Sequence, residues 1–474
     1  MKSNLDYSKM ELTGLPIEFF QQNRVRYMTN LNIRIPNLNA NSVIVLKGGE
    51  EIPRYDTDVN HYHFFQESNF FYLTGVREPC LWAVLDLQAA SCTLFYTQPP
   101  EQNKIWMTVV SSEEMANKYQ VKVESRSSLN DWLAKRNMDT IYLIEGNNEY
   151  SGLEYMPAVL DFTGDLAHLN ERIKHEKLIY EVLCDTRGIK ADYERDLLKF
   201  IGDITNSGHK EIMKYIKPGM YERDLENIFM TYLSENYYIR IWAYPCIGGC
   251  GCNSATLHYD INDKQIKDGD LFLADMGARF CNYTSDVTIT IPASGKFSKK
   301  QKEIYDIVLK ANREVIKSIK PGYTTYPQMD KQSKMIILEE LQKLGLIKDG
   351  VSVDELYSNG IWRIFMPHGL GHFVGLDVHD VGFRNLSFKQ EQIIVEGNFV
   401  TVEPGIYFID FVLDKAFNDP EKSKYLNVDL LKTYKGFGGI RIEDDIFVTE
   451  DGVINFQESL PRTTDEIEAF MAGK

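Results

Sequence analysis

The chain has 474 residues, more than one hydrophobic core normally accommodates, so the sequence predicts two domains. Hydrophobic residues make up 43% of the chain and charged residues 25%, as in ordinary globular proteins. The formal net charge of -16 argues against nucleic acid or an anionic membrane as the main partner.

The cysteine content and the N-terminus favour a cytoplasmic location. The chain has seven cysteines, an odd number, and their spacing shows no disulfide framework, which indicates reduced thiols. The first residues, MKSNLDYSKMELTGLPIEFF, lack the apolar core of a secretory signal. No apolar run approaches the length of a membrane span, so no membrane partner is expected.

Residues 1–185 are predicted to form an α/β domain. Strands are expected at NSVIVLKGG, CTLFYTQ and DTIYLIEG, and a helix at SSEEMANKYQ, which opens with a capping signal. His61 and His63 have the spacing of one strand face and could form a metal pair. No Cys or carboxylate cluster accompanies them, so surface or interface histidines are the favoured interpretation.

Residues 186–474 contain a helical arrangement that occurs twice. A long amphipathic pattern ends at Lys217-Pro218-Gly219 and is followed by the helical pattern YERDLENIFMTYLSEN. About a hundred residues later, a second helix ends at Lys320-Pro321-Gly322 and another helix follows. EIMKYIKPGM and EVIKSIKPGY align without a gap, which indicates an internal duplication. A site between two such halves would take ligands from both.

Four acidic residues interrupt strand-like, otherwise apolar segments: Asp275 in DLFLADMGARF, Asp286 in YTSDVTITIP, Glu403 in NFVTVEPGIYF and Glu443 in GIRIEDDIFV. An unpaired buried carboxylate is costly, so the four acids together need a compensating charge. Shared divalent cations are the simplest explanation. Four carboxylates and one histidine carry a charge of about -4, which two such ions neutralise, and this donor set suits Mn²⁺, Co²⁺ or Zn²⁺.

Two further clusters are candidate metal sites. FMPHGLGHFVGLDVHD contains His368, His372 and His379, and the residues alone do not decide which of them is a ligand. CIGGCGC contains Cys246, Cys250 and Cys252, but no fourth ligand lies at a suitable spacing. These cysteines are therefore interpreted as small buried or loop residues.

Together these motifs resemble the dinuclear pita-bread metallopeptidases, a family that includes methionine aminopeptidase, aminopeptidase P, prolidase and creatinase. LADMGARFCNYTSDVT, FMPHGLGHFVGLDVHDVG, TVEPGIYF and GIRIEDD are similar to prolidase and aminopeptidase P signatures. The resemblance covers nearly the whole chain. It implies an α+β protein whose C-terminal pita-bread catalytic domain, residues 186–474, has a pseudo-two-fold duplication. A creatinase-like α/β domain, residues 1–185, would precede it and serve substrate access and dimerisation.

The resemblance also implies the ligand set. Asp286 and Glu443 would bridge two divalent ions, Asp275 would hold one of them, and His372 with Glu403 would hold the other. Mn²⁺ is the favoured ion, with Co²⁺ and Zn²⁺ as alternatives.

Further roles follow from the same resemblance. His379 would donate a hydrogen bond to the substrate or to the developing oxyanion, and His258 would help to hold the substrate. Tyr244 would line the pocket and His368 would support it. Arg441 would orient ligands and substrate as a nearby cation.

The implied reaction is hydrolysis of the Xaa-Pro bond in dipeptides with a C-terminal proline. The two ions would share a water and deliver it as hydroxide, and Glu403 would carry a proton to the departing nitrogen. Three glycines of the histidine-rich segment, Gly369, Gly371 and Gly375, would let the backbone turn tightly and approach the metals.

The substrate's length depends on a positive residue for its C-terminal carboxylate, and here the sequence departs from the family. Lys389 or Arg384 stands where the resemblance implies an arginine, and lysine lacks the bidentate fork. If neither binds the carboxylate, the alternative is an aminopeptidase P that releases the N-terminal residue from longer Xaa-Pro peptides. A minor alternative is a non-catalytic binding module with the same fold.

The assembly expected from the resemblance is a homodimer acting on small peptides. Trp106 resembles a residue in a segment that reaches towards the partner subunit; an ordinary buried tryptophan is the competing interpretation.

Overall fold

The computed structural model describes residues 6–36, 38, 41–60, 63–148, 151–155, 158–382 and 392–473. The chain divides into two compact units. One consists mainly of Thr13–Arg187 and the other mainly of Gly188–Asp380 with the C-terminal part of the chain; residues before Thr13 also belong to the second unit. No helix in the described ranges has the length and apolar character needed to cross a membrane.

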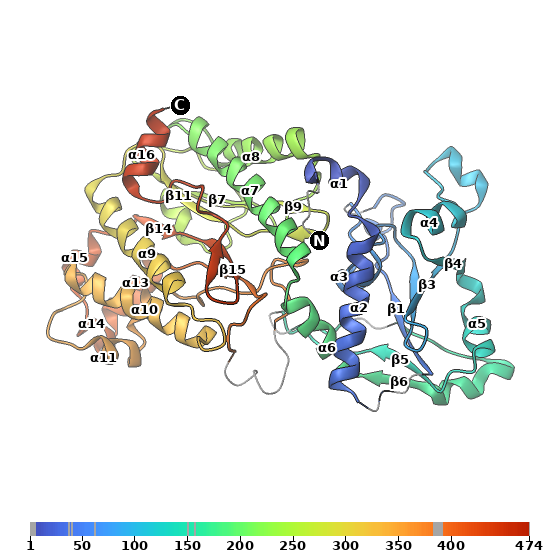
Figure 1. Ribbon diagram of the computed structural model, residues 1–474. Coiled ribbons are helices and arrows are strands. Elements are labelled where there is room, and N and C mark those ends of the chain that lie inside the picture. The colour runs from blue at the N-terminus through green and yellow to red at the C-terminus, as the bar shows by residue number, and fades with distance from the viewer. Residues whose placement is uncertain are drawn as a thin grey trace. The chain divides into compact units, whose positions relative to one another are not determined.

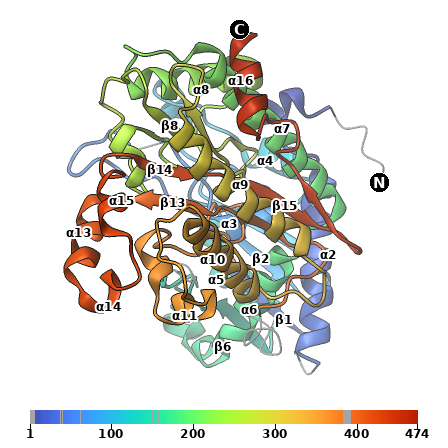
Figure 2. The same ribbon diagram turned by 90° about the vertical axis from the view of Figure 1, so that its left-hand side faces the viewer.

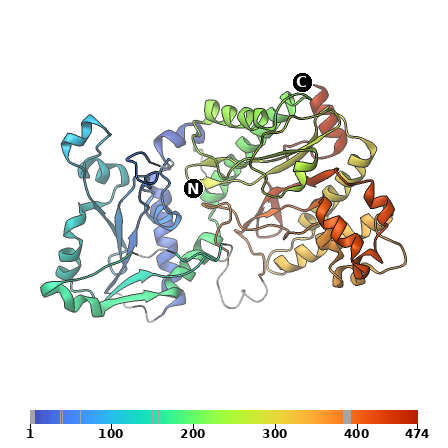
Figure 3. The same cartoon turned by 180° about the vertical axis from the view of Figure 1, so that it is seen from behind.

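The first unit is built on a six-stranded mixed sheet in the order β4-β3-β2-β1-β5-β6 (Figures 1 and 3). The strands are β1 (Ser42–Lys47), β2 (Trp82–Asp86), β3 (Ser91–Tyr96), β4 (Lys122–Ser125), β5 (Thr140–Ile144) and β6 (Ile173–Glu176). The central pairs β1–β2 and β2–β3 are antiparallel, and the three outer pairs are parallel. All three strands expected from the sequence are present.

The helices of this unit are α2 (Ile17–Arg34), α3 (Ser68–Thr74), α4 (Ser112–Tyr119), α5 (Leu129–Lys135) and α6 (Lys177–Gly188); the short α1 (Met10–Thr13) precedes them. The capping signal before α4 is confirmed, because Ser111 and Glu114 form a reciprocal capping box. A buried apolar cluster joins strand residues such as Val45, Val84 and Phe95 to Leu129 and Leu133 of α5. This packing gives the unit its own core.

Trp106 lies just after a short 3-10 helix, Glu101–Ile105, in the first unit. Its side chain is 87% exposed, so the interpretation as an ordinary buried tryptophan is wrong. Its expected approach to a partner subunit stays a prediction.

The second unit contains two helix pairs, α7 (Asp192–Tyr215) with α8 (Glu222–Tyr237) and α9 (Lys299–Ser318) with α10 (Tyr326–Lys343). Figure 2 shows α9 and α10 lying side by side, and the two helices of each pair contact one another. Both Lys-Pro-Gly stops are confirmed as turns: Gly219 has φ +94° and Gly322 has φ +78°, a region that favours glycine.

Each helix pair is followed by a three-stranded antiparallel sheet and a two-stranded antiparallel sheet. The first sheet has the order β11-β8-β7 and the second the order β12-β15-β16. The strands are β7 (Ile247–Cys250), β8 (Leu271–Asp275), β9 (Arg279–Phe280), β10 (Tyr283–Thr284), β11 (Thr288–Pro292), β12 (Phe399–Val402), β13 (Gly405–Phe408), β14 (Gly438–Arg441), β15 (Asp444–Val448) and β16 (Val453–Asn455). The remaining helices are α11 (Val353–Ser358), α13 (Asp410–Asn418), α14 (Pro420–Ser423), α15 (Val428–Lys432) and α16 (Thr464–Ala472).

The acidic segments are arranged differently from the single strands that the sequence pattern indicates. GIRIEDDIFV divides into β14, which pairs with β13, and β15, which pairs with β12, and Glu443 lies between them. Asp275 is the last residue of β8, Asp286 lies just before β11, and Glu403 directly follows β12. All four acids therefore stand at strand ends, where the backbone leaves the ladder and side chains from different sheets can converge.

Candidate metal centre

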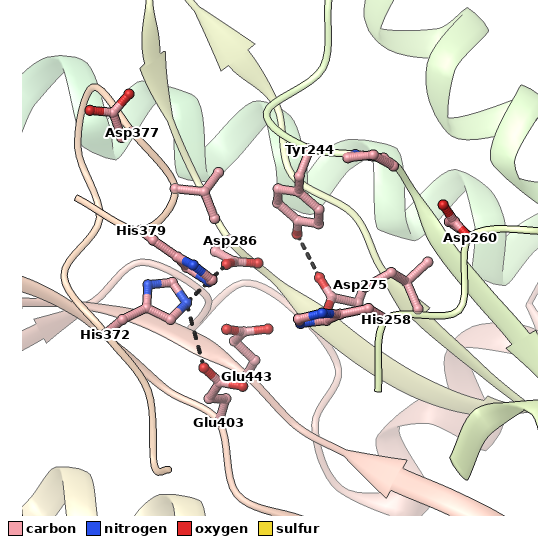
Figure 4. A pocket seen from close by; sticks show the side chains of 13 residues that line it. Tyr244, His258, Asp260, Asp275, Asp286, His372, Asp377, His379, Glu403 and Glu443 are labelled. Atoms are coloured by element: carbon pink, nitrogen blue, oxygen red, sulfur yellow. Dashed lines mark hydrogen bonds and ion pairs between the residues drawn. The ribbon is translucent and has the colours of Figure 1, made fainter. Parts of the chain in front are cut away.

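The second unit contains a pocket of about 490 Å³, which is large enough for a small peptide. Eight of the residues predicted from the sequence line it together: Tyr244, His258, Asp275, Asp286, His372, His379, Glu403 and Glu443 (Figure 4). The other lining residues are Pro245, Ile247, Val378, Asp260 and Asp377. The pocket therefore combines a floor of acids and one buried histidine with apolar walls.

His372 is held so that one ring nitrogen faces the acids. Its Nδ1 lies 3.1 Å from the carbonyl oxygen of Phe373, and its backbone amide donates to Thr401 Oγ1 at 3.0 Å. The opposite nitrogen, Nε2, lies 3.3 Å from Asp286 Oδ2 and 3.5 Å from Glu403 Oε1. A hydrogen bond at Nδ1 orients the ring so that Nε2 is the nitrogen that could bind a metal.

Two of the glycines beside His372 explain how this segment packs. A Cβ on Gly371, which has φ +155°, would lie 2.3 Å from Thr401 Oγ1, and one on Gly375 would lie 2.1 Å from Asp380 Oδ2. Gly369 needs no such space, because a Cβ there would meet nothing within 4 Å. The close approach of the segment to β12 therefore depends on Gly371.

The cluster requires positive charge. Burial raises the pKa of Asp275 to about 6 and that of Glu403 to about 7, and it raises the pKa of Glu443 well above its usual range. Burial alone would lower the pKa of His372, but its hydrogen bond to Asp286 and the charge of Glu403 raise it to about 9. Protons thus partly supply the charge that a bound cation would otherwise provide.

Potential ligand atoms of Asp286, His372 and Glu443 all lie within 4.8 Å of one another. Asp286 Oδ1 is buried and has no hydrogen-bond partner in the described part of the chain. A buried carboxylate oxygen without a donor is costly unless something else binds it. The donor set and this oxygen therefore fit a divalent cation.

Arg441 lies behind the acids and connects them. Its Nη2 donates to Asp275 Oδ2 at 2.7 Å, its Nη1 to the Tyr407 hydroxyl at 3.0 Å and its Nε to Thr288 Oγ1 at 3.2 Å. Thr288 Oγ1 in turn donates to Glu443 Oε2 at 2.6 Å, and the Tyr244 hydroxyl donates to Asp275 Oδ1 at 2.6 Å. This network holds two of the acids in place without filling their remaining lone pairs.

The three histidines of segment 365–380, FMPHGLGHFVGLDVHD, occupy different places. The rings of His372 and His379 lie 4.3 Å apart, and His379 is exposed in the pocket. Burial of the ring, followed by the charge of His372, lowers the pKa of His379 and favours its neutral form. His368 does not line the pocket; its Nε2 lies 3.0 Å from the Tyr407 hydroxyl.

Other predicted residues either lie outside the described part of the chain or are placed away from this pocket. Arg384, Lys389 and His61 lie outside the described residues, and His63 is exposed in the first unit. The cysteines of CIGGCGC form no metal cluster within the described ranges: two of them are buried, and Cys252 is exposed.

Sequence reasoning missed the supporting residues. Thr288 and Tyr407 contact Arg441, while Asp445 accepts a hydrogen bond from the backbone amide of Asp286 at 3.1 Å. Arg462 Nη2 donates to the carbonyl oxygen of Glu443 at 2.7 Å. Asp445 adjoins the predicted acids in the sequence, which was a usable signal; the other three carry no such mark.

Comparison with known proteins defines the class. Residues 196–450, more than half of the chain, match the model of metallopeptidase family M24, and residues 20–142 match the aminopeptidase P N-terminal domain. The chain belongs to metallopeptidase family M24. The predicted fold, a pita-bread unit preceded by an N-terminal α/β unit, is therefore confirmed.

Individual relatives are similar over nearly their whole length. The chain is 37% identical to Xaa-Pro dipeptidase from Homo sapiens, covering 98% of this chain and 95% of that protein. It is 32% identical to a probable Xaa-Pro aminopeptidase from Paracoccidioides brasiliensis, covering 92% and 94%. A zinc-substituted structure of Escherichia coli aminopeptidase P in complex with product has a TM-score of 0.78 at 28% identity, covering 97% and 99%.

Proposed function

We propose that the protein is a metal-dependent Xaa-Pro dipeptidase. The observation that carries the proposal is the pocket itself: four acids and His372, drawn from both halves of the duplicated unit, gather beside His258 and His379. Full-length similarity to a human Xaa-Pro dipeptidase supports the same activity. Small peptides with a proline on the C-terminal side of the cleaved bond are the proposed substrates.

The proposed cofactor is a pair of divalent ions, with Mn²⁺ favoured over Co²⁺ and Zn²⁺. Asp286 and Glu443 would contact both ions, Asp275 would hold one, and His372 with Glu403 would hold the other. The oxygen-rich donor set and the unpartnered Asp286 Oδ1 support this assignment. When bound, such ions supply an activated water as the nucleophile and offset the charge of the acids.

The side chains around the acids would orient the peptide and move its protons. His379 and His258 would donate hydrogen bonds to the substrate carbonyl or carboxylate, and His379 would stabilise negative charge developing on the carbonyl oxygen. Glu403 would accept a proton from the attacking water and deliver it to the proline nitrogen, which must be protonated to depart. Arg441 does not line the pocket, so it would act indirectly, by holding Asp275 in position.

The shape of the pocket suits an Xaa-Pro bond. This bond is a tertiary amide without an N–H, so the strand-like docking of ordinary peptidases is not available to it. The apolar side chains of Pro245, Ile247 and Val378 offer a wall for the pyrrolidine ring and for the preceding side chain.

Release of the N-terminal residue from longer peptides, as in aminopeptidase P, is the second candidate. Two observations favour it: the probable Xaa-Pro aminopeptidase and the aminopeptidase P structure both match this chain over nearly their full length. The proposed determinants of substrate length are Lys389 and Arg384, one of which would bind a free C-terminal carboxylate.

The test compares Xaa-Pro dipeptides with Xaa-Pro-Yaa tripeptides on the wild type, Lys389→Ala and Arg384→Ala. We expect faster dipeptide cleavage, and a selective loss of it, by about 10-fold to 100-fold, in the variant that lacks the carboxylate-binding residue. Faster tripeptide cleavage would instead identify an aminopeptidase P. Activity that survives removal of metal by a chelator would contradict the metal mechanism, and absence of any cleavage with Mn²⁺ would favour a binding module.

We also propose the setting of this activity. The seven cysteines are spaced without a disulfide framework, which supports a reducing cytoplasm. Residues 1–185 are proposed to control substrate access and to form a homodimer, with exposed Trp106 at the interface, and residues 186–474 to carry the catalysis.

A further inference from the structure

Glu222 is a buried carboxylate outside the metal centre. It is the first residue of α8, and its side chain is fully buried. It accepts four hydrogen bonds from described residues, and all four donors are neutral groups. Burial of a carboxylate costs free energy, and four donors converge on this one to offset that cost. Glu222 therefore fixes the segments that carry these donors.

The four donors are distributed along one segment of the chain, from its first residue to its last. Oε1 accepts from the backbone amide of Cys250 at 2.8 Å and from Asn253 Nδ2 at 3.0 Å. Oε2 accepts from the Tyr259 hydroxyl at 2.8 Å and from the backbone amide of Lys264 at 2.9 Å. One carboxylate thus closes the segment 250–264, which we call the His258 loop.

Two additional hydrogen bonds reinforce the same closure. The backbone amide of Glu222 donates to the carbonyl oxygen of Lys264 at 2.9 Å, and Asn253 Nδ2 also donates to the Tyr259 hydroxyl at 2.9 Å. The loop is therefore tied to the N-terminal end of α8 through backbone and side chain together.

The His258 loop supplies side chains to the pocket. His258 and Asp260 are exposed and line the pocket, and Figure 4 shows His258 beside Asp275. Tyr259 between them is buried, and its hydroxyl donates to Glu222. Fixing Tyr259 on one side of the backbone therefore fixes the direction of His258 on the other.

We propose that Glu222 is a positioning residue for substrate binding, which holds the His258 loop so that His258 meets the peptide. This inference rests on the proposed peptidase function. Glu222 does not line the pocket, so it acts through His258 and not on the substrate itself.

The role requires a carboxylate. A glutamine at this position would turn its NH₂ group towards a donor in either orientation. On one side it would face the amides of Cys250 and Asn253, and on the other it would face the amide of Lys264. One backbone N–H would lose its acceptor in each case, so the loop would detach at one end.

The experiment is a double-mutant cycle on the full-length, Mn²⁺-loaded protein with an Xaa-Pro dipeptide. The variants are Glu222→Gln, Tyr259→Phe, His258→Ala and the two double variants with His258→Ala. Glu235→Gln is the matched control, because it replaces the same side chain by the same amide at an exposed position of α8. KM, kcat, metal content and melting temperature are measured for each.

We expect Glu222→Gln to raise KM about 10-fold with a much smaller change in kcat and unchanged metal content. Tyr259→Phe should raise KM in the same direction by less, because it removes one donor only. In the His258→Ala background neither change should raise KM further. Glu235→Gln should behave as the wild type.

Several outcomes would overturn the inference. KM effects that persist in full in the His258→Ala background would show a general structural role, and an unchanged KM in both single variants would show no role. If Glu222→Gln does not fold, the Tyr259→Phe cycle decides the question alone. A wild type that cleaves no Xaa-Pro peptide would refute the proposed function, whereas active wild type with indifferent variants would refute only this inference.

Discussion

Hydroxyl groups around the acids decide how firmly a cation can be held. Thr288 Oγ1 donates to Glu443 Oε2 at 2.6 Å while accepting from Arg441 Nε at 3.2 Å. The hydroxyl therefore links the two side chains and orients the carboxylate relative to the arginine. Such a hydroxyl favours the ionised form of Glu443, which burial alone disfavours. Supporting hydrogen bonds of this kind tune metal affinity strongly.

We expect Thr288→Val to weaken metal binding about 10-fold or more, because the isosteric side chain removes the donor to Glu443 and leaves Arg441 Nε without its acceptor. Titration of metal-free protein with Mn²⁺ against a competing chelator measures the effect. Thr290→Val is the matched control: Thr290 lies on the same strand and is equally buried, but among the described residues its hydroxyl bonds only to the backbone of Arg441. Equal Mn²⁺ affinity in the wild type and Thr288→Val would contradict the expectation.

The four acids could be singled out from the sequence because each interrupts an apolar segment, whereas His372 is separated from the two neighbouring histidines only by the family resemblance. Thr288 and Tyr407 could not be predicted. A threonine that alternates with isoleucine is typical of any strand, and the partner of Thr288 lies 155 residues away in the chain. Its role follows only from tertiary contacts between segments of different sheets.

Among the elements, a buried ion pair fixes the end of the segment that carries His368, His372 and His379. Lys190, just before α7, contacts Asp380 at 3.0 Å, and both side chains are 1% exposed. Asp380 directly follows His379, and its carboxylate packs against Gly375. The residues just before α7 are thereby tied to the end of segment 365–380.

We expect Lys190→Met to lower the free energy of unfolding by about 3 kcal/mol or more, since it removes one partner of a buried ion pair. Lys199→Met, which breaks an exposed pair with Asp203 on α7, should cost less than about 1 kcal/mol. Denaturant unfolding of the two variants measures both values. A Lys190→Met variant as stable as Lys199→Met would contradict the importance of the pair.

The helices and their Lys-Pro-Gly turns could be predicted because capping residues, Pro and Gly act locally. The division of GIRIEDDIFV into β14 and β15 could not, because it depends on which strands pair. β13 and β12 each take one part of this segment, and Glu443 lies at the change of partner. Local alternation predicts one strand there, whereas long-range pairing makes two.

For the whole molecule, the metal centre couples stability to pH. The pKa values of Asp275 and Glu403 are raised to about 6 and about 7, so metal-free protein loses stability as these buried acids ionise. The pKa of His372 is raised to about 9, so the stability gained from its charged form is present below its unfolded pKa and is lost as pH rises towards 9. The pKa of Asp286 is lowered, so this residue affects the pH dependence of stability only at acid pH. Asp275, Glu403 and His372 thus each make metal-free protein less stable as pH rises.

Bound cations require the deprotonated forms of the same groups, so they should stabilise the protein most strongly at high pH. We expect the melting temperature gained on adding Mn²⁺ to metal-free protein to be clearly larger at about pH 8.5 than at about pH 5.5. Calorimetric melting of one metal-free preparation, with and without Mn²⁺ at each pH, measures the difference. Asp286→Asn is the control, because loss of this ligand should make the melting temperature nearly indifferent to Mn²⁺. A stabilisation by Mn²⁺ that is constant, or largest at low pH, would show that these groups do not exchange protons for metal.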